Sequence, residues 1–265
     1  MKAFLLAAGL GTRLRPLTDS IPKCLVPING KPLLQIWLDL CQGHRITEVL
    51  VNTHHLPHLV REYFEESGYK LYVDKNKAEE LNLSTYNLST YQRGPMRISL
   101  AYEPVLLGSG GTIRANREFV DNEKEFFILY GDNLTNANLT EMIRFHRSHG
   151  EMFTMGLFKT DRPTSCGIAE LNGDGKIISF EEKPKSPKTD LAAAGVYAAS
   201  PKIFNFFPDG QREDYLKPLD LGFHILPKVV GHMYGYVIDD YLLDIGDMES
   251  YQKAREEWPR VSRLS

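Results

Sequence analysis

The chain has 265 residues, of which 42% are hydrophobic and 25% charged, which is enough apolar material for one large α/β domain or one domain with a small annex. Its net charge of −3 argues against a nucleic-acid surface, and no apolar segment approaches the roughly twenty residues of a membrane-spanning helix. Cys24, Cys41 and Cys166 lack metal-type spacing, and an odd count indicates reduced thiols in the cytoplasm.

The first half alternates short apolar runs with helical stretches, a pattern typical of a mostly parallel, Rossmann-like α/β sheet flanked by helices. Expected strands are 2–8, 48–52, 70–73, 97–102 and 126–130, and expected helices are 32–44, 56–67 and 109–119. Between them, 75–93 is polar and holds a near-duplication, LSTYN then LSTYQ. We expect a long loop that is solvated, contacts another subunit or covers the site.

The second half is rich in strands, expected over 152–159, 167–171, 177–183 and 193–199, with closing helices over 201–207 and 250–258. Asn172-Gly173-Asp174-Gly175 predicts a hairpin turn between the second and third of these strands. No long repeat or Pro/Gly linker separates the halves. We therefore expect two lobes of a single domain.

The most informative segment follows the first expected strand, where residues 5–18 read LLAAGLGTRLRPLT and Pro22-Lys23 follow. Glycines let backbone N–H groups approach an anion, and Arg13, Arg15 and Lys23 would neutralise its charge, which predicts a polyphosphate site. A Walker loop is excluded, because its Gly-Lys-Ser/Thr end is missing. The dinucleotide fingerprint lacks its third glycine, at Leu14, so an NAD-dependent oxidoreductase is disfavoured.

These residues match the signature Gly-x-Gly-Thr-Arg-Leu-x-Pro-Leu-Thr and Pro-Lys of the sugar-phosphate nucleotidylyltransferases, which the chain resembles. Four more landmarks follow in order: LLGSGGTI at 106–113, YGD at 130–132, FEEKP at 180–184 and LDIG at 243–246. The resemblance covers nearly the whole chain. It implies a nucleotide-binding lobe at 1–135 and a β-rich sugar-phosphate-binding lobe at 136–265.

The implied reaction joins a nucleoside triphosphate to a sugar 1-phosphate and releases pyrophosphate. Its nucleophile is already an anion, which explains why no Ser-His-Asp or Cys-His constellation is apparent. The resemblance assigns catalysis to Arg13 and Lys23, with Arg13 stabilising the departing pyrophosphate. The nucleotide-binding residues that it implies are Leu6, Ala8, Gly9, Gly11, Thr12, Arg13, Gly108, Gly110 and Gly111.

Asp132 and Asp244 each follow an apolar run, where the carboxyl end of a strand faces a ligand crevice in open α/β sheets. Mg²⁺ favours one or two carboxylates plus phosphate oxygens, so we expect both to bind magnesium. Each aspartate could instead cap a helix or turn. The cluster His54-His55-x-x-His58 lacks the glutamate of a zincin motif, and we interpret it as structural.

The resemblance gives the sugar phosphate to Glu182, which would accept from sugar hydroxyls, and to Lys183, which would pair with the phosphate. Gly167 and Gly195 are expected where backbone approaches the sugar. The alternatives are surface charges at a strand end and two packing glycines.

Within the family, VNTHHL at 51–56, the LLGSGGT run and DDY at 239–241 are most similar to mannose or manno-heptose 1-phosphate guanylyltransferases. Uridylyl-, thymidylyl- and cytidylyltransferases share the same landmarks, so the base stays open. A regulatory relative that binds without catalysis is the rival from another class. Expected partners are the two substrates, without nucleic acid or membrane, and a homo-oligomer is allowed.

Overall fold

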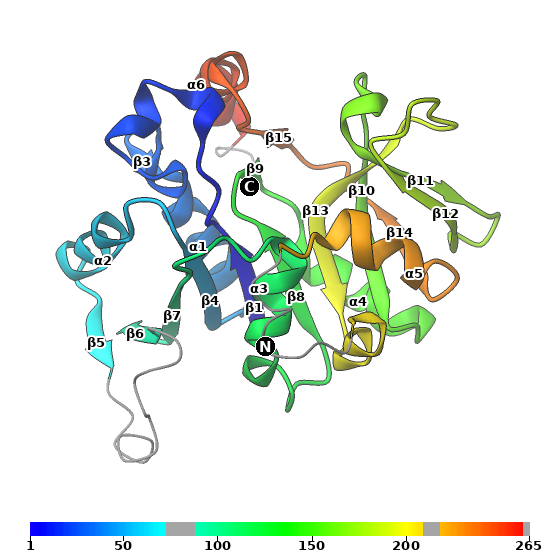
Figure 1. The fold of residues 1–265 in the computed structure, drawn as a ribbon, viewed down its shortest axis with the longest axis horizontal. Coiled ribbons are helices and arrows are strands. Elements are labelled where there is room, and N and C mark those ends of the chain that lie inside the picture. The colour runs from blue at the N-terminus through cyan, green and yellow to red at the C-terminus, as the bar shows by residue number, and fades with distance from the viewer. Residues whose placement is uncertain (73–87, 209–217, 262–265) are drawn as a thin grey trace. The chain divides into compact units, whose positions relative to one another are not determined.

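The computed structural model describes residues 1–72, 88–208 and 218–261, which form two compact units (Figure 1). Unit 1 is Met1–Leu106, Tyr130–Leu134 and Leu243–Ser265, and unit 2 is Leu107–Leu129 and Thr135–Leu242. The expected boundary at 135/136 therefore differs from this division. Leu107–Leu129 lies in unit 2, and the end of the chain returns to unit 1.

Unit 1 contains the parallel sheet (Figure 1). Its strand order is β1 (Lys2–Leu6), β4 (Glu48–Thr53), β7 (Met96–Tyr102), β6 (Leu88–Arg93) and β5 (Lys70–Tyr72). β1, β4 and β7 pair in parallel, whereas β6 pairs antiparallel with both β7 and β5. The parallel strands are largely apolar and buried, as expected for strands covered on both faces.

The helices of unit 1 are α1 (Leu33–Gly43), α2 (Pro57–Glu66) and α6 (Met248–Val261). A proline at its first position begins α2. Phe64 of this helix stacks on Tyr91 of β6, with the ring centroids 5.4 Å apart. Short 3₁₀ turns at Thr12–Leu14, Leu17–Asp19 and Lys23–Leu25 shape the N-terminal loop, and β2 (Pro27–Ile28) pairs with β3 (Lys31–Pro32).

Part of the expected 75–93 loop is a strand. Leu88–Arg93 forms β6, because Tyr91 buries its ring and Thr90 contacts Ser99 of β7 across the pair. The expectation of a loop is therefore wrong for 88–93. The first copy of the near-duplication lies outside the described residues.

Unit 2 is built mainly of antiparallel strands. β13 (Leu191–Ala199) pairs with β8 (Phe126–Tyr130) and β10 (Phe153–Lys159), and also contacts β11 (Gly167–Leu171). β11 and β12 (Ile177–Glu182) form the predicted hairpin, and β14 (Met233–Val237) runs parallel to β10. The α/β class with a β-rich second half is confirmed.

The helices of unit 2 are α3 (Ser109–Ala115), α4 (Leu139–His149) and α5 (Leu226–Val229), which continues a π-helix over Leu221–Ile225. The expected helix at 109–119 divides into α3 and a 3₁₀ turn at Arg117–Phe119, and 201–207 is a 3₁₀ helix at Pro201–Phe206. β9 (Asn133–Thr135) and β15 (Leu242–Asp244) lie where the chain passes from one unit to the other. Within the described ranges, no helix has the length and apolar character needed to cross a bilayer.

Candidate active site

Two glycines give the N-terminal loop its shape and its open backbone. Gly11 has a φ of +65°, a conformation that side chains disfavour, and a Cβ there would lie 2.9 Å from Cγ2 of Thr18. The Thr18 hydroxyl donates to the Gly11 carbonyl at 2.7 Å and closes the loop. At Gly9 a Cβ would meet nothing within 4 Å. Gly11 therefore serves the fold, and the Gly9 backbone is open to a ligand.

Polar side chains connect the ends of the three parallel strands. The amide of Ala7, between Leu6 and Ala8, donates to Asn52 Oδ1 at 2.7 Å, and Asn52 Nδ2 donates to Glu103 Oε1 at 2.9 Å. Asn52 is the second-last residue of β4, Glu103 directly follows β7, and both are buried. Sequence reasoning missed both residues, although polar residues at the carboxyl ends of neighbouring strands were a usable signal.

Two histidines of the cluster, His54 and His55, make backbone contacts, whereas His58 is exposed. His54 Nδ1 lies 2.7 Å from the Glu103 carbonyl, and His55 Nε2 lies 3.0 Å from the Thr18 carbonyl. Both contacts fix the strand ends and the loop, in line with the structural interpretation.

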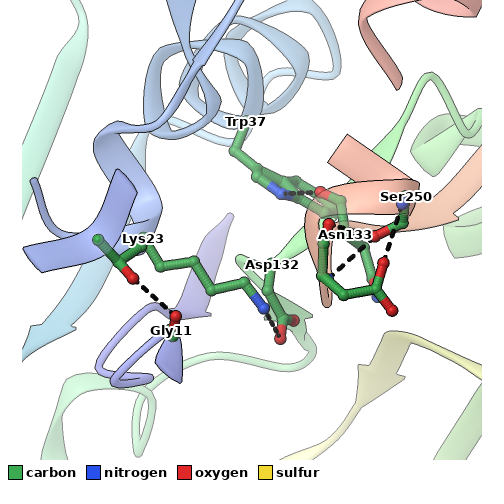
Figure 2. A network of polar contacts seen from close by, with 8 residues as sticks. Gly11, Lys23, Trp37, Asp132, Asn133 and Ser250 are labelled. Atoms are coloured by element: carbon green, nitrogen blue, oxygen red, sulfur yellow. Dashed lines mark hydrogen bonds and ion pairs between the residues drawn. The ribbon is translucent and has the colours of Figure 1, made fainter. Parts of the chain in front are cut away.

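Lys23 and Asp132 form an ion pair, with Nζ 2.9 Å from Oδ2 (Figure 2). The Lys23 side chain is 10% exposed and that of Asp132 is 42% exposed, so the pair sits at the protein surface with its cation mostly enclosed. Trp37 anchors the next residue, because its Nε1 donates to the Asn133 carbonyl at 2.7 Å (Figure 2). The aspartate is therefore held on a fixed backbone.

The chain brings Asp244 and Arg13 to the same place. Ile245 N–H donates to the Asp132 carbonyl at 2.9 Å, which joins the two aspartate segments. A Cβ on Gly246 would lie 2.9 Å from Asp244 Oδ2 and 3.1 Å from Arg13 Nη2. Gly246 therefore leaves room for the carboxylate and the guanidinium, and a larger residue would require one of these side-chain ends to move.

Charged groups around Asp244 shift its pKa in opposite directions. Desolvation by the surrounding protein raises the pKa of Asp244, and the Asp132 carboxylate raises it further, whereas Lys23 and Arg13 lower it. The residue as a whole is exposed. The carboxylate that accepts from Ser250 N–H at the start of α6 is that of Asp247, so Asp244 does not make this capping contact.

Asp132 and Asp244 supply two carboxylates, and their assignment to a magnesium ion stays a prediction. Among the residues that the structure describes, no group of three or more His, Cys, Asp or Glu could hold a metal ion. Mg²⁺ commonly takes one or two carboxylates and completes its shell with phosphate oxygens and water.

In unit 2, the glycines at the start of α3 make room for a neighbouring backbone. A Cβ at Gly108 would lie 2.6 Å from the Leu219 carbonyl oxygen, and one at Gly110 would lie 3.1 Å from it. Gly111 N–H donates to the same carbonyl at 2.9 Å. The amide of Gly111 is therefore already bound within the protein, while its nucleotide-binding role stays a prediction.

Glu182 lies between two glycines. A Cβ at Gly167 or at Gly222 would lie 2.5 Å from Glu182 Oε2. Burial raises the pKa of Glu182, the Asp220 carboxylate raises it further, and Lys183 lowers it. Gly222 and Asp220 were not predicted, because their proximity to Glu182 is not local in the sequence.

Lys183 and Gly195 both have positive φ, of 52° and 65°. Lys183 N–H donates to the Cys166 carbonyl at 3.0 Å, and its Nζ lies 5.9 Å from the Phe223 ring centroid. Gly195 lies where the register between β10 and β13 shifts, so a β-bulge accounts for this glycine.

The structure brings together two sets of predicted residues, each within one unit. Gly108, Gly110 and Gly111, which are predicted to bind nucleotide, lie in unit 2 and belong to neither set. Arg13, Lys23, Asp132 and Asp244 meet in unit 1 beside the loop that contains Gly9, Gly11 and Thr12. Gly167 and Glu182 meet in unit 2, and Lys183 follows Glu182 directly.

A parallel α/β sheet with a cationic glycine loop beyond its first strand is the architecture of a nucleotide-binding α/β protein. The model of the family described as Nucleotidyl transferase matches residues 2–260. The chain belongs to this family.

Two curated relatives and one solved structure illustrate the similarity. UTP–glucose-1-phosphate uridylyltransferase of Synechocystis sp. is 31% identical over 264 residues, which cover 96% of this chain and 62% of the relative. The catalytic subunit beta of mannose-1-phosphate guanylyltransferase from Danio rerio is 29% identical over 255 residues, covering 95% of this chain and 62% of the relative. The chain therefore spans 62% of the length of these relatives.

The solved structure is a Bacillus anthracis protein crystallised in complex with a sucrose. Its TM-score is 0.76 at 22% identity, over 97% of this chain and 94% of that one. This likeness concerns the fold.

Proposed function

We propose that this chain transfers a nucleotidyl group from a nucleoside triphosphate to a sugar 1-phosphate. The observation that supports this most is the meeting of Arg13, Lys23, Asp132 and Asp244 beside the glycine loop. Two cations and two carboxylates at the strand ends suit two phosphate substrates and one divalent cation. In this proposal the N-terminal loop of unit 1 binds the triphosphate, and Glu182 and Lys183 of unit 2 bind the sugar phosphate.

In the reaction, an oxygen of the sugar 1-phosphate attacks the α-phosphorus and forms a new P–O bond. The bond between the α- and β-phosphates breaks, and pyrophosphate leaves with the electron pair. No proton is removed, so the protein's contribution is positioning and charge compensation. Arg13 carries a guanidinium that can bind phosphate oxygens in a bidentate way, and it would stabilise the departing pyrophosphate.

Lys23 would act at the α-phosphate. Its ion pair with Asp132 holds the ammonium in place while the mostly enclosed stem limits its freedom. A lysine oriented before the substrate arrives costs less ordering entropy on binding.

Asp132 and Asp244 would hold Mg²⁺ through their carboxylates, and the charge of the ion would offset the repulsion between them. The ion would neutralise phosphate charge. The three free cysteines support a cytoplasmic setting for this chemistry.

For the substrates, we propose GTP with mannose or manno-heptose 1-phosphate. The motifs at 51–56 and 239–241 and the guanylyltransferase relative support guanine. The uridylyltransferase relative supports the alternative of another base and sugar. A regulatory subunit without catalysis would be expected to lack Arg13, Lys23 or an aspartate, and all are present.

The decisive experiment incubates the purified protein with Mg²⁺, each nucleoside triphosphate in turn and a panel of sugar 1-phosphates. Released pyrophosphate is measured. We expect the greatest pyrophosphate release with GTP and one of the sugar 1-phosphates. Release only with UTP, dTTP or CTP would contradict the guanine proposal, and no release with any pair would contradict the enzyme proposal.

A further inference from the structure

Asp220 connects the start of α3 with the π-helix Leu221–Ile225. Its Oδ2 accepts from the Ser109 hydroxyl at 3.2 Å, and its Oδ1 accepts from Phe223 N–H at 2.9 Å. Ser109 Oγ in turn accepts from Leu221 N–H at 2.7 Å. Asp220 and Ser109 therefore connect the π-helix to the start of α3, and both residues lie within unit 2.

The π-helix forms one wall around Glu182. A Cβ at Gly222 would lie 2.5 Å from Glu182 Oε2 and 3.3 Å from Asp220 Oδ1, so both carboxylates border the same small space. A shift of Gly222 would either crowd the Glu182 carboxylate or leave a gap beside it. The position of Glu182 thus depends on the segment that Asp220 fixes.

The π-helix also contacts Lys183, the residue that follows Glu182. Phe223 is 53% exposed, and its ring centroid lies 5.9 Å from Lys183 Nζ, within cation–π range. Its backbone amide is the one that Asp220 accepts from. One aspartate therefore fixes the neighbours of both Glu182 and Lys183.

We propose that Asp220 is a positioning residue for Glu182 and Lys183 and thereby determines affinity for the sugar 1-phosphate. This inference rests on the proposed function, which assigns the sugar 1-phosphate to these two residues. Asp220 acts through Gly222 and Phe223 and does not itself touch the substrate.

A charge effect accompanies the geometric one. The charged groups that act on Glu182 are Asp220 on the π-helix, which raises its pKa, and Lys183 at the end of its own strand, which lowers it. His224 adds an imidazole on the π-helix, with Nδ1 2.9 Å from Asp220 N. Glu182 accepts from sugar hydroxyls when it is ionised, so removal of the Asp220 charge extends tight binding to lower pH.

Two variants separate geometry from charge. Asp220→Asn keeps an oxygen for Phe223 N–H and removes the charge, whereas Asp220→Ala removes both. We expect Asp220→Ala to raise KM for the sugar 1-phosphate about tenfold, with kcat within about twofold. KM for the triphosphate should rise less, although Asp220 also holds Ser109 between the predicted nucleotide-binding residues Gly108 and Gly110. For Asp220→Asn we expect a near-normal KM at neutral pH and a rise of KM on acidification that begins at lower pH than in the wild type. Asp161→Ala, at an exposed aspartate of the same unit, is the control.

Equal rises of both KM values, or an unchanged KM for the sugar 1-phosphate in Asp220→Ala, would overturn the inference. If Asp220→Ala does not fold, the Asp220→Asn pH profile decides alone, and a profile equal to the wild type overturns it.

Calorimetric binding of mannose 1-phosphate without triphosphate separates this inference from the proposed function. If the wild type binds it but releases no pyrophosphate, and Asp220→Ala binds it more weakly, the positioning role stands and the enzyme proposal fails. If the wild type turns over and Asp220→Ala binds as the wild type does, only the positioning role fails. No binding and no turnover would contradict both.

Discussion

At the scale of single residues, the N-terminal loop separates two uses of glycine. Gly11 adopts a left-handed conformation against Thr18, and Gly9 has open space where its side chain would be. A substitution at each position therefore tests a different property, stability at one and ligand approach at the other.

We expect Gly11→Ala to lower the free energy of unfolding by about 1–2 kcal/mol, because alanine is strained at positive φ and its Cβ meets Thr18. Gly9→Ala should unfold at the wild-type urea concentration but raise KM for the triphosphate, since its Cβ occupies space that a phosphate needs. Urea titrations and initial rates measure both. Equal KM values for Gly9→Ala and wild type would exclude a close approach of phosphate to residue 9.

The aspartate of the ion pair gives a second prediction at this scale. Asp132→Asn keeps an oxygen that can accept from Lys23 Nζ, so folding should be nearly unchanged, while kcat falls by a factor on the order of 100 or more because a fixed anionic metal ligand is lost. Circular dichroism and steady-state kinetics in Mg²⁺ provide the measurement. Asp174→Asn, at an exposed hairpin position, is the matched control. Near-normal turnover of Asp132→Asn would remove Asp132 from the metal site.

The sequence allowed Arg13, Lys23, Asp132 and Asp244 to be singled out, because a motif or a strand end marks each of them. It did not predict the ion pair between Lys23 and Asp132, which joins positions 109 apart. Asp220 and Gly222 were not predicted either, because they are far from Glu182 in the sequence. A capping aspartate and a helical glycine are common, and only the fold brings them to Glu182.

At the scale of elements, the buried apolar strands and the Asn-Gly-Asp-Gly hairpin were predictable because their signals are local. Helix α4 was not predicted, although its sequence contains local signals for a helix. Asn138 Oδ1 accepts from Glu141 N–H at its start, Gly150 ends it, and its buried positions repeat at helical spacing. Strand β6 was missed because its strand character comes from pairing with β7 rather than from its own composition.

The contact between α4 and β10 predicts a dependence of stability on pH. His146 is buried, its Nδ1 lies 2.8 Å from Thr154 Oγ1, and burial first and His149 second lower its pKa to about 4. Between its ordinary pKa near 6.5 and about 4, the unfolded chain binds a proton that the folded chain does not, so stability falls as pH falls. We expect a loss of up to about 3 kcal/mol from this group.

Urea unfolding at a series of pH values from 7 to 4 tests this, with His146→Phe as the comparison. The variant lacks the titrating group and should lose less stability on acidification than the wild type. Parallel pH dependences of the two proteins would mean that other groups carry the effect.

At the scale of the molecule, unit 1 is assembled from three stretches of chain. Its last stretch supplies Asp244 and α6, where Tyr251 Oη donates to the Pro27 carbonyl at 2.9 Å and Ala254 is fully buried. The C-terminal segment is therefore part of the unit that contains the N-terminal loop, both in structure and in the proposed chemistry.

Ending the chain after Leu242 should therefore lower the thermal midpoint by about 10 °C, as buried surface worth several kcal/mol is lost from unit 1, and abolish pyrophosphate release. Full-length Asp244→Asn separates the two effects, because it keeps α6 and should lose turnover alone. Calorimetry and the pyrophosphate assay are the measurements. A truncated chain that melts like the wild type would show that α6 contributes little to stability.

The path of the chain also orders events during translation. Along the chain, Met1–Leu106 of unit 1 is made before unit 2, and Leu243–Ser265 of unit 1 is made after it. A nascent protein therefore contains the glycine loop early, yet it lacks Asp244 and α6 until unit 2 has been made. A nascent chain that ends within unit 2 thus lacks one of the two carboxylates of the proposed metal site.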